Sequence, residues 1–237
     1  MYKSKIILTT RTCIGLIAVM ISGKLTQSLP EPEKSSKTAP LYKARTFDFE
    51  GIPFLSEEQK QQHYKLYEGY VKKLNEIRSK LPEAAYDSGI TYSPYRALKI
   101  AETFALNGVL LHEYYFENIC NGADTKPQEV LLKLITEQFG SLDSFIEDLK
   151  HAAGCARGWV LTGYTLSDGH IYNYVLDAHN ETVPVLTIPL IIVDVYEHAY
   201  FMDFGTNRTE YIKLLINNLN WNVIENRAQK LMNMIKN

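Results

Sequence analysis

The sequence predicts an α+β fold, in which an N-terminal antiparallel helical hairpin precedes a C-terminal α/β domain with a small three-stranded antiparallel sheet flanked by helices. Two observations lead to this prediction. Residues 56–81 and 93–119 carry apolar side chains at helical spacing. Residues 158–193 contain three β-rich segments, and an Asp-Gly turn typical of a hairpin separates the first two. With 237 residues, 46% of them hydrophobic, the chain can bury one good core or two small ones.

The N-terminal segment has the composition of a targeting sequence. Residues 1–30 contain four Lys or Arg and no Asp or Glu, and their apolar run, residues 12–22, is too short to cross a bilayer. A basic start followed by such a run is typical of a secretory signal peptide, so we predict one over residues 1–28, with export to the periplasm or secretion. An organelle transit peptide and an uncleaved membrane anchor over residues 1–23 are the alternatives. Only the anchor would attach the chain to a membrane.

A polar stretch, residues 29–45, follows and is typical of a flexible linker. We expect folded structure from Thr46. It should comprise a helical hairpin domain over residues 46–122 and a mixed α/β domain over residues 123–237.

The composition after the N-terminal segment limits the possible partners. Without residues 1–30 the chain has 21 Lys and Arg against 27 Asp and Glu, and no basic stripe interrupts this acidic balance. We therefore expect no nucleic-acid partner. Two cysteines, Cys120 and Cys155, could pair in an oxidising compartment, but two buried thiols are an equally good expectation.

Capping patterns predict both helices of the hairpin. Ser56 followed three residues later by Gln59 is a capping box, which begins a helix that Pro82 ends. Ser93 before Pro94 begins the second helix, because proline is favoured at the first helical position. A short loop between two such helices favours an antiparallel pair.

Each predicted helix carries one histidine on its inward stripe, His63 on the first and His112 on the second. A lone histidine on an apolar face is usually a hydrogen-bonded core residue. Two of them on facing helices change that expectation, since a shared metal would satisfy both buried imidazoles. Gly108, one turn before His112, would let the partner helix come close at that level.

The mixed half is expected to contain two short helices, then the three strands, then two final helices. Gly140 should separate the two short helices, and Asn207 should cap the next one because Glu210 follows it by three residues. The expected helices span residues 127–139, 141–152, 207–219 and 221–235, and the expected strands span residues 158–166, 170–176 and 187–193.

Asp194 and His198 are the most informative pair in the chain. They follow the β-rich run of residues 183–193 and stand four residues apart, so a helical turn at that point would place them on one face. A carboxylate with an imidazole is a ligand pair for a first-row transition metal. Taken alone, the pair is better explained by a surface ion pair. Together with His63 and His112 it becomes half of a four-ligand site.

From about Phe47 to Arg227 the chain resembles the iron/manganese superoxide dismutases. Asp194 to Tyr200 resembles the family signature Asp-Val-Trp-Glu-His-Ala-Tyr, with Tyr196 in place of Trp. Further matches follow in the family's order, namely Phe139-Gly140-Ser141 at the helix junction, Gly158-Trp159 in the first strand, and Asn220-Trp221 with Arg227 in the C-terminal helix.

The resemblance implies conversion of superoxide to dioxygen and hydrogen peroxide at a mononuclear redox metal. One iron or manganese ion per subunit would be held by three histidines and one aspartate. The matching ligands are His63, His112, Asp194 and His198.

The first-helix ligand depends on register. Counting forward from Ser56 gives His63, whereas counting back from Tyr70 gives Gln62, because this helix is one residue shorter than the family's. A one-residue deletion can convert a π-bulge into regular helix. His63 lies seven residues before Tyr70, on the same face, and is therefore the predicted ligand.

The resemblance also implies roles for residues around the metal. A glutamine or histidine of the family hydrogen-bonds the solvent at the metal, and counting from the hairpin turn assigns that role to His179. Tyr70 resembles the gateway tyrosine that relays protons beside the substrate channel. Trp159 is expected to line the pocket and exclude water.

Glu197 and Tyr200 imply a homodimer. In the family this glutamate reaches across a two-fold axis to the metal-bound histidine of the other subunit, which corresponds to His198. The family tyrosine pairs with a first-helix histidine that is absent from residues 65–67, Lys-Leu-Tyr.

The alternative is a metal-free or catalytically inactive relative of the same fold that serves in binding or assembly. Retention of all four ligands argues against it. A metal-dependent hydrolase is a weaker reading, since the motifs supply no spare carboxylate base near the site.

Overall fold

The computed structural model describes residues 40–85, 91–122 and 125–236. The predicted signal peptide and most of the predicted linker lie outside these residues. The described residues belong to one compact unit. Within the described part of the chain, no helix combines the length and hydropathy that crossing a bilayer requires.

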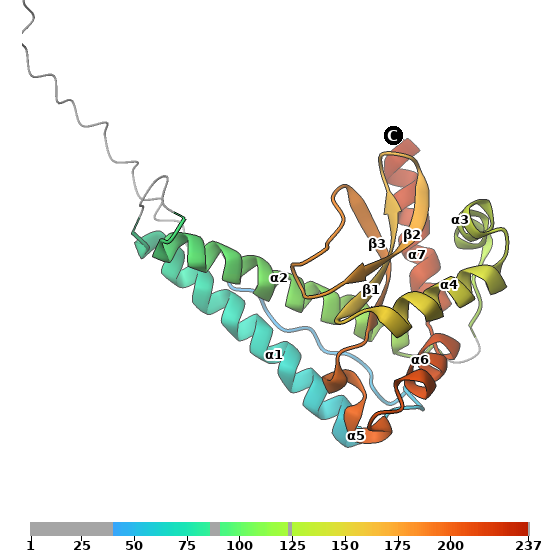
Figure 1. The fold of residues 1–237 in the computed structure, drawn as a ribbon, viewed down its shortest axis with the longest axis horizontal. Helices are drawn as coiled ribbons and strands as arrows, with labels where there is room; N and C mark the ends of the chain where they lie inside the picture. Colours follow the sequence, from blue (N-terminus) through green and yellow to red (C-terminus); the bar gives the residue numbers. More distant parts are fainter. Residues whose placement is uncertain (1–39, 86–90, 123–124, 237) are drawn as a thin grey trace, which may run out of the picture. The chain divides into compact units, whose positions relative to one another are not determined.

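Two long antiparallel helices form the N-terminal part, as predicted (Figure 1). α1 (Glu57–Lys80) begins at Ser56, whose hydroxyl accepts the main-chain N–H of Gln59 at 3.2 Å, and a 3-10 turn, η1 (Leu81–Glu83), follows it. α2 (Pro94–Ile119) begins in the same way at Ser93. The two caps satisfy N–H groups that the first helical turn leaves without partners.

The capping box at Ser56 is only half formed, which corrects the prediction. In a full box the Gln59 side chain would accept the Ser56 N–H. Here Asp203 Oδ2 accepts that N–H at 2.7 Å, and the Gln59 side chain bonds to the main chain of His198 and Met202 instead.

The C-terminal part contains the three predicted strands, β1 (Trp159–Thr165), β2 (His170–Leu176) and β3 (Thr187–Asp194). They lie in the order β2-β1-β3, and both neighbours are antiparallel to β1. Gly140, with φ of 79°, ends the first of the short helices, as expected of a left-handed glycine. Two short elements after β3, η2 and α5, were not predicted. In chain order, the helices and strands of the C-terminal part are α3 (Glu129–Phe139), α4 (Leu142–Cys155), β1 (Trp159–Thr165), β2 (His170–Leu176), β3 (Thr187–Asp194), η2 (Glu197–Ala199), α5 (Phe201–Phe204), α6 (Arg208–Asn217) and α7 (Trp221–Lys236).

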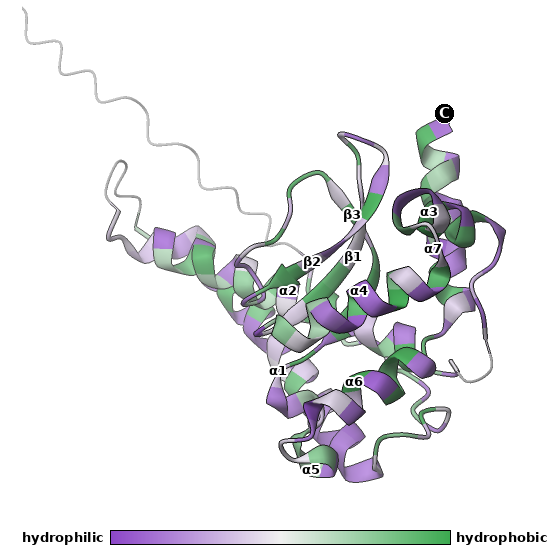
Figure 2. Ribbon diagram, turned by 45° about the vertical axis from the view of Figure 1, so that its right-hand side comes forward, coloured by the Kyte–Doolittle hydropathy of each residue, from purple (hydrophilic) through white to green (hydrophobic). Residues whose placement is uncertain are grey.

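Helix α2 joins the hairpin to the sheet. It packs against α1 on one side and against β3 and α7 on the other, while α3 and α4 pack against β2. Along the helices hydrophobic residues alternate with hydrophilic ones, as expected when one face is buried (Figure 2). The C-terminal half of α2 lies beside the end of β3, where Asn118 Nδ2 donates to the Ile192 carbonyl at 2.8 Å, and the site described below is formed there.

Folded structure begins before the predicted boundary at Thr46. The Tyr42 N–H donates to Asn75 Oδ1 at 2.8 Å, and Asn75 Nδ2 returns a bond to the Tyr42 carbonyl at 2.9 Å. The Arg45 N–H donates to the Tyr67 hydroxyl at 2.8 Å. These bonds fix residues 42–45 on α1, so this end of the predicted linker is ordered.

The two cysteines of the described chain are free thiols. Cys155 is exposed and Cys120 is partly buried. Burial raises the pKa of Cys120 to about 12, which keeps this thiol protonated and unreactive at neutral pH.

Candidate metal centre

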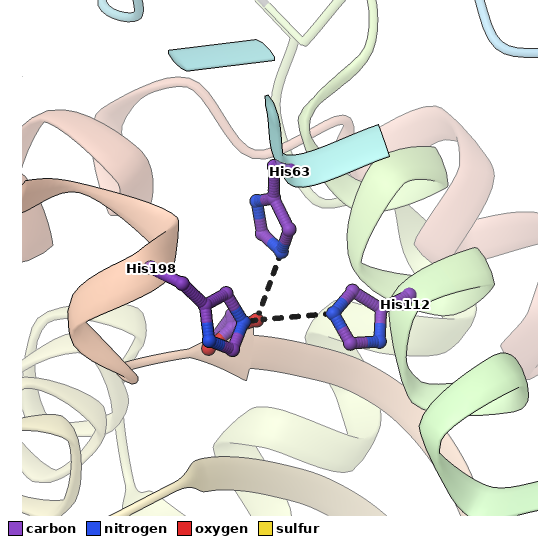
Figure 3. A group of neighbouring side chains, drawn as sticks. His63, His112 and His198 are labelled. Carbon is purple, nitrogen blue, oxygen red and sulfur yellow. Dashed lines mark hydrogen bonds and ion pairs between the residues drawn. The ribbon is translucent and has the colours of Figure 1, made fainter. Parts of the chain in front are cut away.

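The four predicted ligands meet at one point. His63 Nε2 and His198 Nε2 each lie 3.2 Å from Asp194 Oδ2, and His112 Nε2 lies 3.8 Å from the same oxygen. One potential ligand atom from each of the four residues falls within 4.8 Å of the others. Figure 3 shows the rings of His63, His112 and His198 directed toward a common centre from three separate segments.

Helix α1 settles the register of the first ligand. It is a regular α-helix from Glu57 to Lys80, with no π-bulge. His63 is 2% exposed and faces the cluster, whereas Gln62 is exposed and donates to Glu58 Oε1 at 2.7 Å. The structure therefore brings His63 into the site and leaves Gln62 on the surface.

Asp194 and His198 reach the site by a different local structure from the one expected. Asp194 is the last residue of β3, where it pairs with Trp159, and no helix begins there. Its Oδ1 accepts the Tyr196 N–H at 3.0 Å, which turns the chain, and the 3-10 turn η2 then carries His198 back. Because this turn is tight, the side chains of Asp194 and His198 still point into the same site.

The hydrogen bonds of His112 leave one ring nitrogen free to bind a cation. Its Nδ1 donates to the Gly108 carbonyl at 2.6 Å, so the neutral ring carries its lone pair on Nε2. Nε2 is buried and has no hydrogen-bond partner in the described structure. Such orphaned atoms are rare in protein interiors. A lone pair aimed at a carboxylate and two further imidazoles fits a metal ligand.

The charge states also suit a metal. Burial lowers the pKa of His63 and of His112, so both rings are neutral at physiological pH. Burial alone would raise the pKa of Asp194, but its interactions with His198 and then His63 outweigh this and hold that pKa below the ordinary range. Neutral imidazoles with one carboxylate are a donor set for iron or manganese.

A second group of side chains adjoins the ligands. Trp159 Nε1 donates to His179 Nδ1 at 2.9 Å, and His179 Nε2 lies 2.7 Å from the Tyr70 hydroxyl. Because an indole can only donate, His179 carries its proton on Nε2 and donates it to the Tyr70 oxygen. Burial lowers the pKa of His179 to about 4, which keeps the ring neutral. The predicted Tyr70, His179 and Trp159 thus form one chain of hydrogen bonds.

The loop that carries His179 is held in place by residues that sequence reasoning missed. Asn107 Nδ2, from α2, donates to the His179 carbonyl at 2.7 Å. Thr182 has a left-handed backbone, φ 59°, and its hydroxyl accepts the Asp177 N–H at 3.0 Å and bonds to the Val175 carbonyl. In the sequence, the only sign of this role for Asn107 was its place beside Gly108 on the buried face of the predicted helix.

Between Asp194 and α5, Glu197 faces outward, while the rings of Tyr196 and Tyr200 pack against other aromatic rings. Glu197 is exposed, and its carboxylate makes no hydrogen bond or ion pair with the described residues. Tyr196 stacks on His198, with ring centroids 5.2 Å apart. Tyr200 is 5% exposed and stacks on Tyr211, with ring centroids 4.8 Å apart.

Comparisons with known proteins give matches over most of the chain. The model of the C-terminal domain of iron/manganese superoxide dismutases matches residues 127–227. A protein of Aquifex aeolicus (strain VF5), named as an iron superoxide dismutase, is 41% identical over 190 residues, covering 78% of this chain and 88% of the relative. An iron enzyme by name from Cupriavidus metallidurans is 32% identical over 171 residues, covering 70% and 85%. A manganese enzyme by name from Mycolicibacterium smegmatis is 31% identical over 170 residues, covering 70% and 80%.

Proposed function

This chain belongs to the iron/manganese superoxide dismutase family, and from that premise we propose that it converts superoxide to dioxygen and hydrogen peroxide at a mononuclear metal centre. The observation that carries the proposal is the convergence of His63, His112, Asp194 and His198. A binding or assembly protein of the same fold would not need four ligand atoms aimed at one buried point.

The ligand set suits the reaction. When bound, the iron or manganese ion supplies the one-electron chemistry that oxidises one superoxide and reduces the next. The three neutral imidazoles and the Asp194 carboxylate contribute one negative charge, so a divalent or trivalent cation keeps a net positive charge toward a small anion. We propose one ion per subunit, because a single cluster of this kind occurs among the described residues.

Reduction of superoxide to hydrogen peroxide consumes protons, and Tyr70 is placed to deliver one. The Tyr70 oxygen accepts the His179 Nε2–H, so its own hydroxyl proton is directed elsewhere. The Tyr70 ring lies 5.3 Å from the His112 ring. Burial raises the pKa of Tyr70 to about 12, and so the hydroxyl keeps its proton through the physiological range.

Trp159 closes the inner side of the site. It is fully buried and meets the His112 ring edge-on, with centroids 4.9 Å apart. An indole in this position excludes water from the imidazole while its N–H orients His179. We propose that this is how the pocket is kept dry around the ligands.

We also propose that the protein acts as a homodimer. Glu197 is exposed beside His198, and Phe201 and Met202, which follow, are 48% and 56% exposed. A carboxylate next to apolar side chains suits an interface between two copies of the chain. The buried Tyr200 would support this interface indirectly, by packing in the core of its own subunit.

Export is a separate proposal, which rests on sequence alone. The basic start and apolar run of residues 1–28 support a cleaved signal peptide and a periplasmic or secreted enzyme. The mass and first residue of the protein recovered from its native cell would test this.

The test of the proposed function is metal analysis and a superoxide dismutation assay on one preparation. We expect bound iron or manganese and turnover in the unsubstituted protein, and loss of both in His112→Ala. His170→Ala, at the exposed start of β2, is the matched control and should behave as the unsubstituted protein. Stoichiometric metal without superoxide turnover would contradict the proposal.

A further inference from the structure

Gln59 contacts the main chain of the segment that carries His198. This residue lies on α1, four residues before His63, and is fully buried. Its Nε2 donates to the His198 carbonyl at 2.6 Å, and its Oε1 accepts the Met202 N–H at 3.2 Å. One side-chain amide therefore bonds to the main chain at two points, on η2 and at the start of α5.

His198 has the weakest local support of the four ligands. Its side chain is 30% exposed, whereas those of His63, His112 and Asp194 are at most 1% exposed. It lies in a three-residue 3-10 turn, whose hydrogen-bond geometry is poorer than that of an α-helix. The position of its ring therefore depends on what holds the turn from outside.

We propose that Gln59 is a positioning residue that fixes the His198 turn against α1 and so sets the separation of the His63 and His198 rings. This inference rests on the proposed metal centre. Gln59 and His63 share one face of a rigid helix, so a shift of the turn relative to Gln59 is a shift of His198 relative to His63. The bond from the Ser56 N–H to Asp203 Oδ2, at 2.7 Å, ties the same two segments one turn earlier.

The consequence is an effect on the metal without direct contact. Removing a hydrogen bond that orients a ligand lowers metal affinity by roughly ten- to a hundred-fold in known sites. Loss of the Gln59 amide should therefore weaken metal binding and change the ligand field, while leaving all four ligands in the chain.

The experiment compares Gln59→Met with two controls. Methionine keeps the volume of the side chain and removes both hydrogen bonds. Gln62→Met makes the same change on the exposed face of the same helix. Leu74→Ala destabilises the buried face of α1 about three turns beyond His63, so it controls for a simple loss of stability.

Metal affinity is measured by competition with a chelator, together with the absorption band of the bound metal and the urea midpoint of each variant. We expect Gln59→Met to lose affinity about ten- to a hundred-fold and to shift the band. Leu74→Ala should lower the midpoint and leave both metal readouts unchanged. Gln59→Asn, which keeps an amide on a shorter side chain, should show a smaller change in the same direction.

If Gln59→Met has the same metal affinity and the same absorption band as Leu74→Ala, the inference is wrong and Gln59 is a packing residue. The metal content of the unsubstituted protein tests the proposed function. The ratio of the metal affinity of Gln59→Met to that of the unsubstituted protein tests the role of Gln59. A failure of the proposed function can therefore be told from a failure of this inference.

Discussion

At the scale of single residues, the role of each histidine follows from the partner of its second ring nitrogen. The Gly108 carbonyl accepts from His112 Nδ1, so His112 presents a bare Nε2 to the metal. The Trp159 indole donates to His179 Nδ1, so His179 presents an N–H to Tyr70. These two rings lie 6.0 Å apart and have opposite functions, because one neighbour is an acceptor and the other a donor.

The buried histidines predict an acid-sensitive fold once metal is removed. Burial lowers the pKa of His63, His112 and His179 below the ordinary value of 6.5, so below that pH the unfolded chain takes up protons that the folded chain does not. The free energy of unfolding should then fall with falling pH. The slope should be up to ~1.4 kcal/mol per pH unit for each of His63 and His112.

Urea unfolding of the metal-stripped protein, between about pH 8 and about pH 5, measures this slope. His179→Gln removes one of the groups and should make the dependence shallower, while the exposed His170→Ala should not. A free energy of unfolding that stays constant over this range would show that these rings are not held neutral by the fold.

Tyr70→Phe should separate proton delivery from metal binding. The variant keeps the ring beside His112 but loses the hydroxyl that accepts from His179. We expect full metal content and a fall in turnover of about a hundred-fold, the lower end of what a positioned proton donor contributes.

Tyr64→Phe is the matched control, since its hydroxyl bonds to the Arg45 carbonyl and not to His179. Turnover in Tyr70→Phe equal to that in Tyr64→Phe would exclude Tyr70 from the proton path.

At the scale of elements, the close approach of α1 and α2 depends on Gly108. A Cβ at this position would lie 2.8 Å from Cδ1 of the Tyr70 ring, whereas a Cβ at Gly69, on α1, would meet nothing within 4 Å. Gly108→Ala should therefore cost about 1–3 kcal/mol through overpacking, less up to ~1 kcal/mol gained in helix propensity. Because the Tyr70 ring must shift, its hydrogen bond with His179 should be disturbed, and turnover should fall as well.

Gly69→Ala is the control, and it should be neutral or stabilising by up to ~1 kcal/mol with unchanged turnover. Urea midpoints and the dismutation assay compare the two variants. If Gly108→Ala and Gly69→Ala stabilise the protein equally, α1 and α2 can move apart at Gly108 without loss of stability, which would contradict the prediction.

Elements with local signals were predicted from the sequence, and elements without them were not. Ser56, Ser93 and Asn207 cap their helices as expected, and the Asp-Gly turn forms the β1–β2 hairpin. The turn η2 and the helix α5 span three and four residues, too few for a periodic pattern to show. The half-formed capping box was missed because its acceptor, Asp203, lies 147 residues away in sequence.

The candidate site divides in the same way. His63 and His112 were predicted from helical stripes, which are local patterns. Asp194 and His198 were singled out by an expected helical turn that is not there, and the family resemblance completed the set. Gln59 and Asn107 were missed because each acts on the main chain of a distant segment, which leaves no trace in the spacing of side chains.

At the scale of the whole molecule, the dimer proposal makes a prediction about size. Sedimentation velocity should show two chains in the native particle. Met202→Asp, which puts a charge on the exposed apolar group beside Glu197, should yield a single chain. Leu132→Asp, at an exposed leucine of α3, is the control and should leave the dimer intact. A native particle of one chain would contradict the proposal.

The central claim is that His63, His112, Asp194 and His198 together hold one redox metal that dismutates superoxide. Adding iron or manganese back to the metal-stripped protein, while following superoxide decay by stopped flow, tests it most directly. The rate should rise in proportion to bound metal and level off at one ion per chain, and His112→Ala should stay at the uncatalysed rate. Decay that stays uncatalysed in fully loaded protein with both metals would contradict the account.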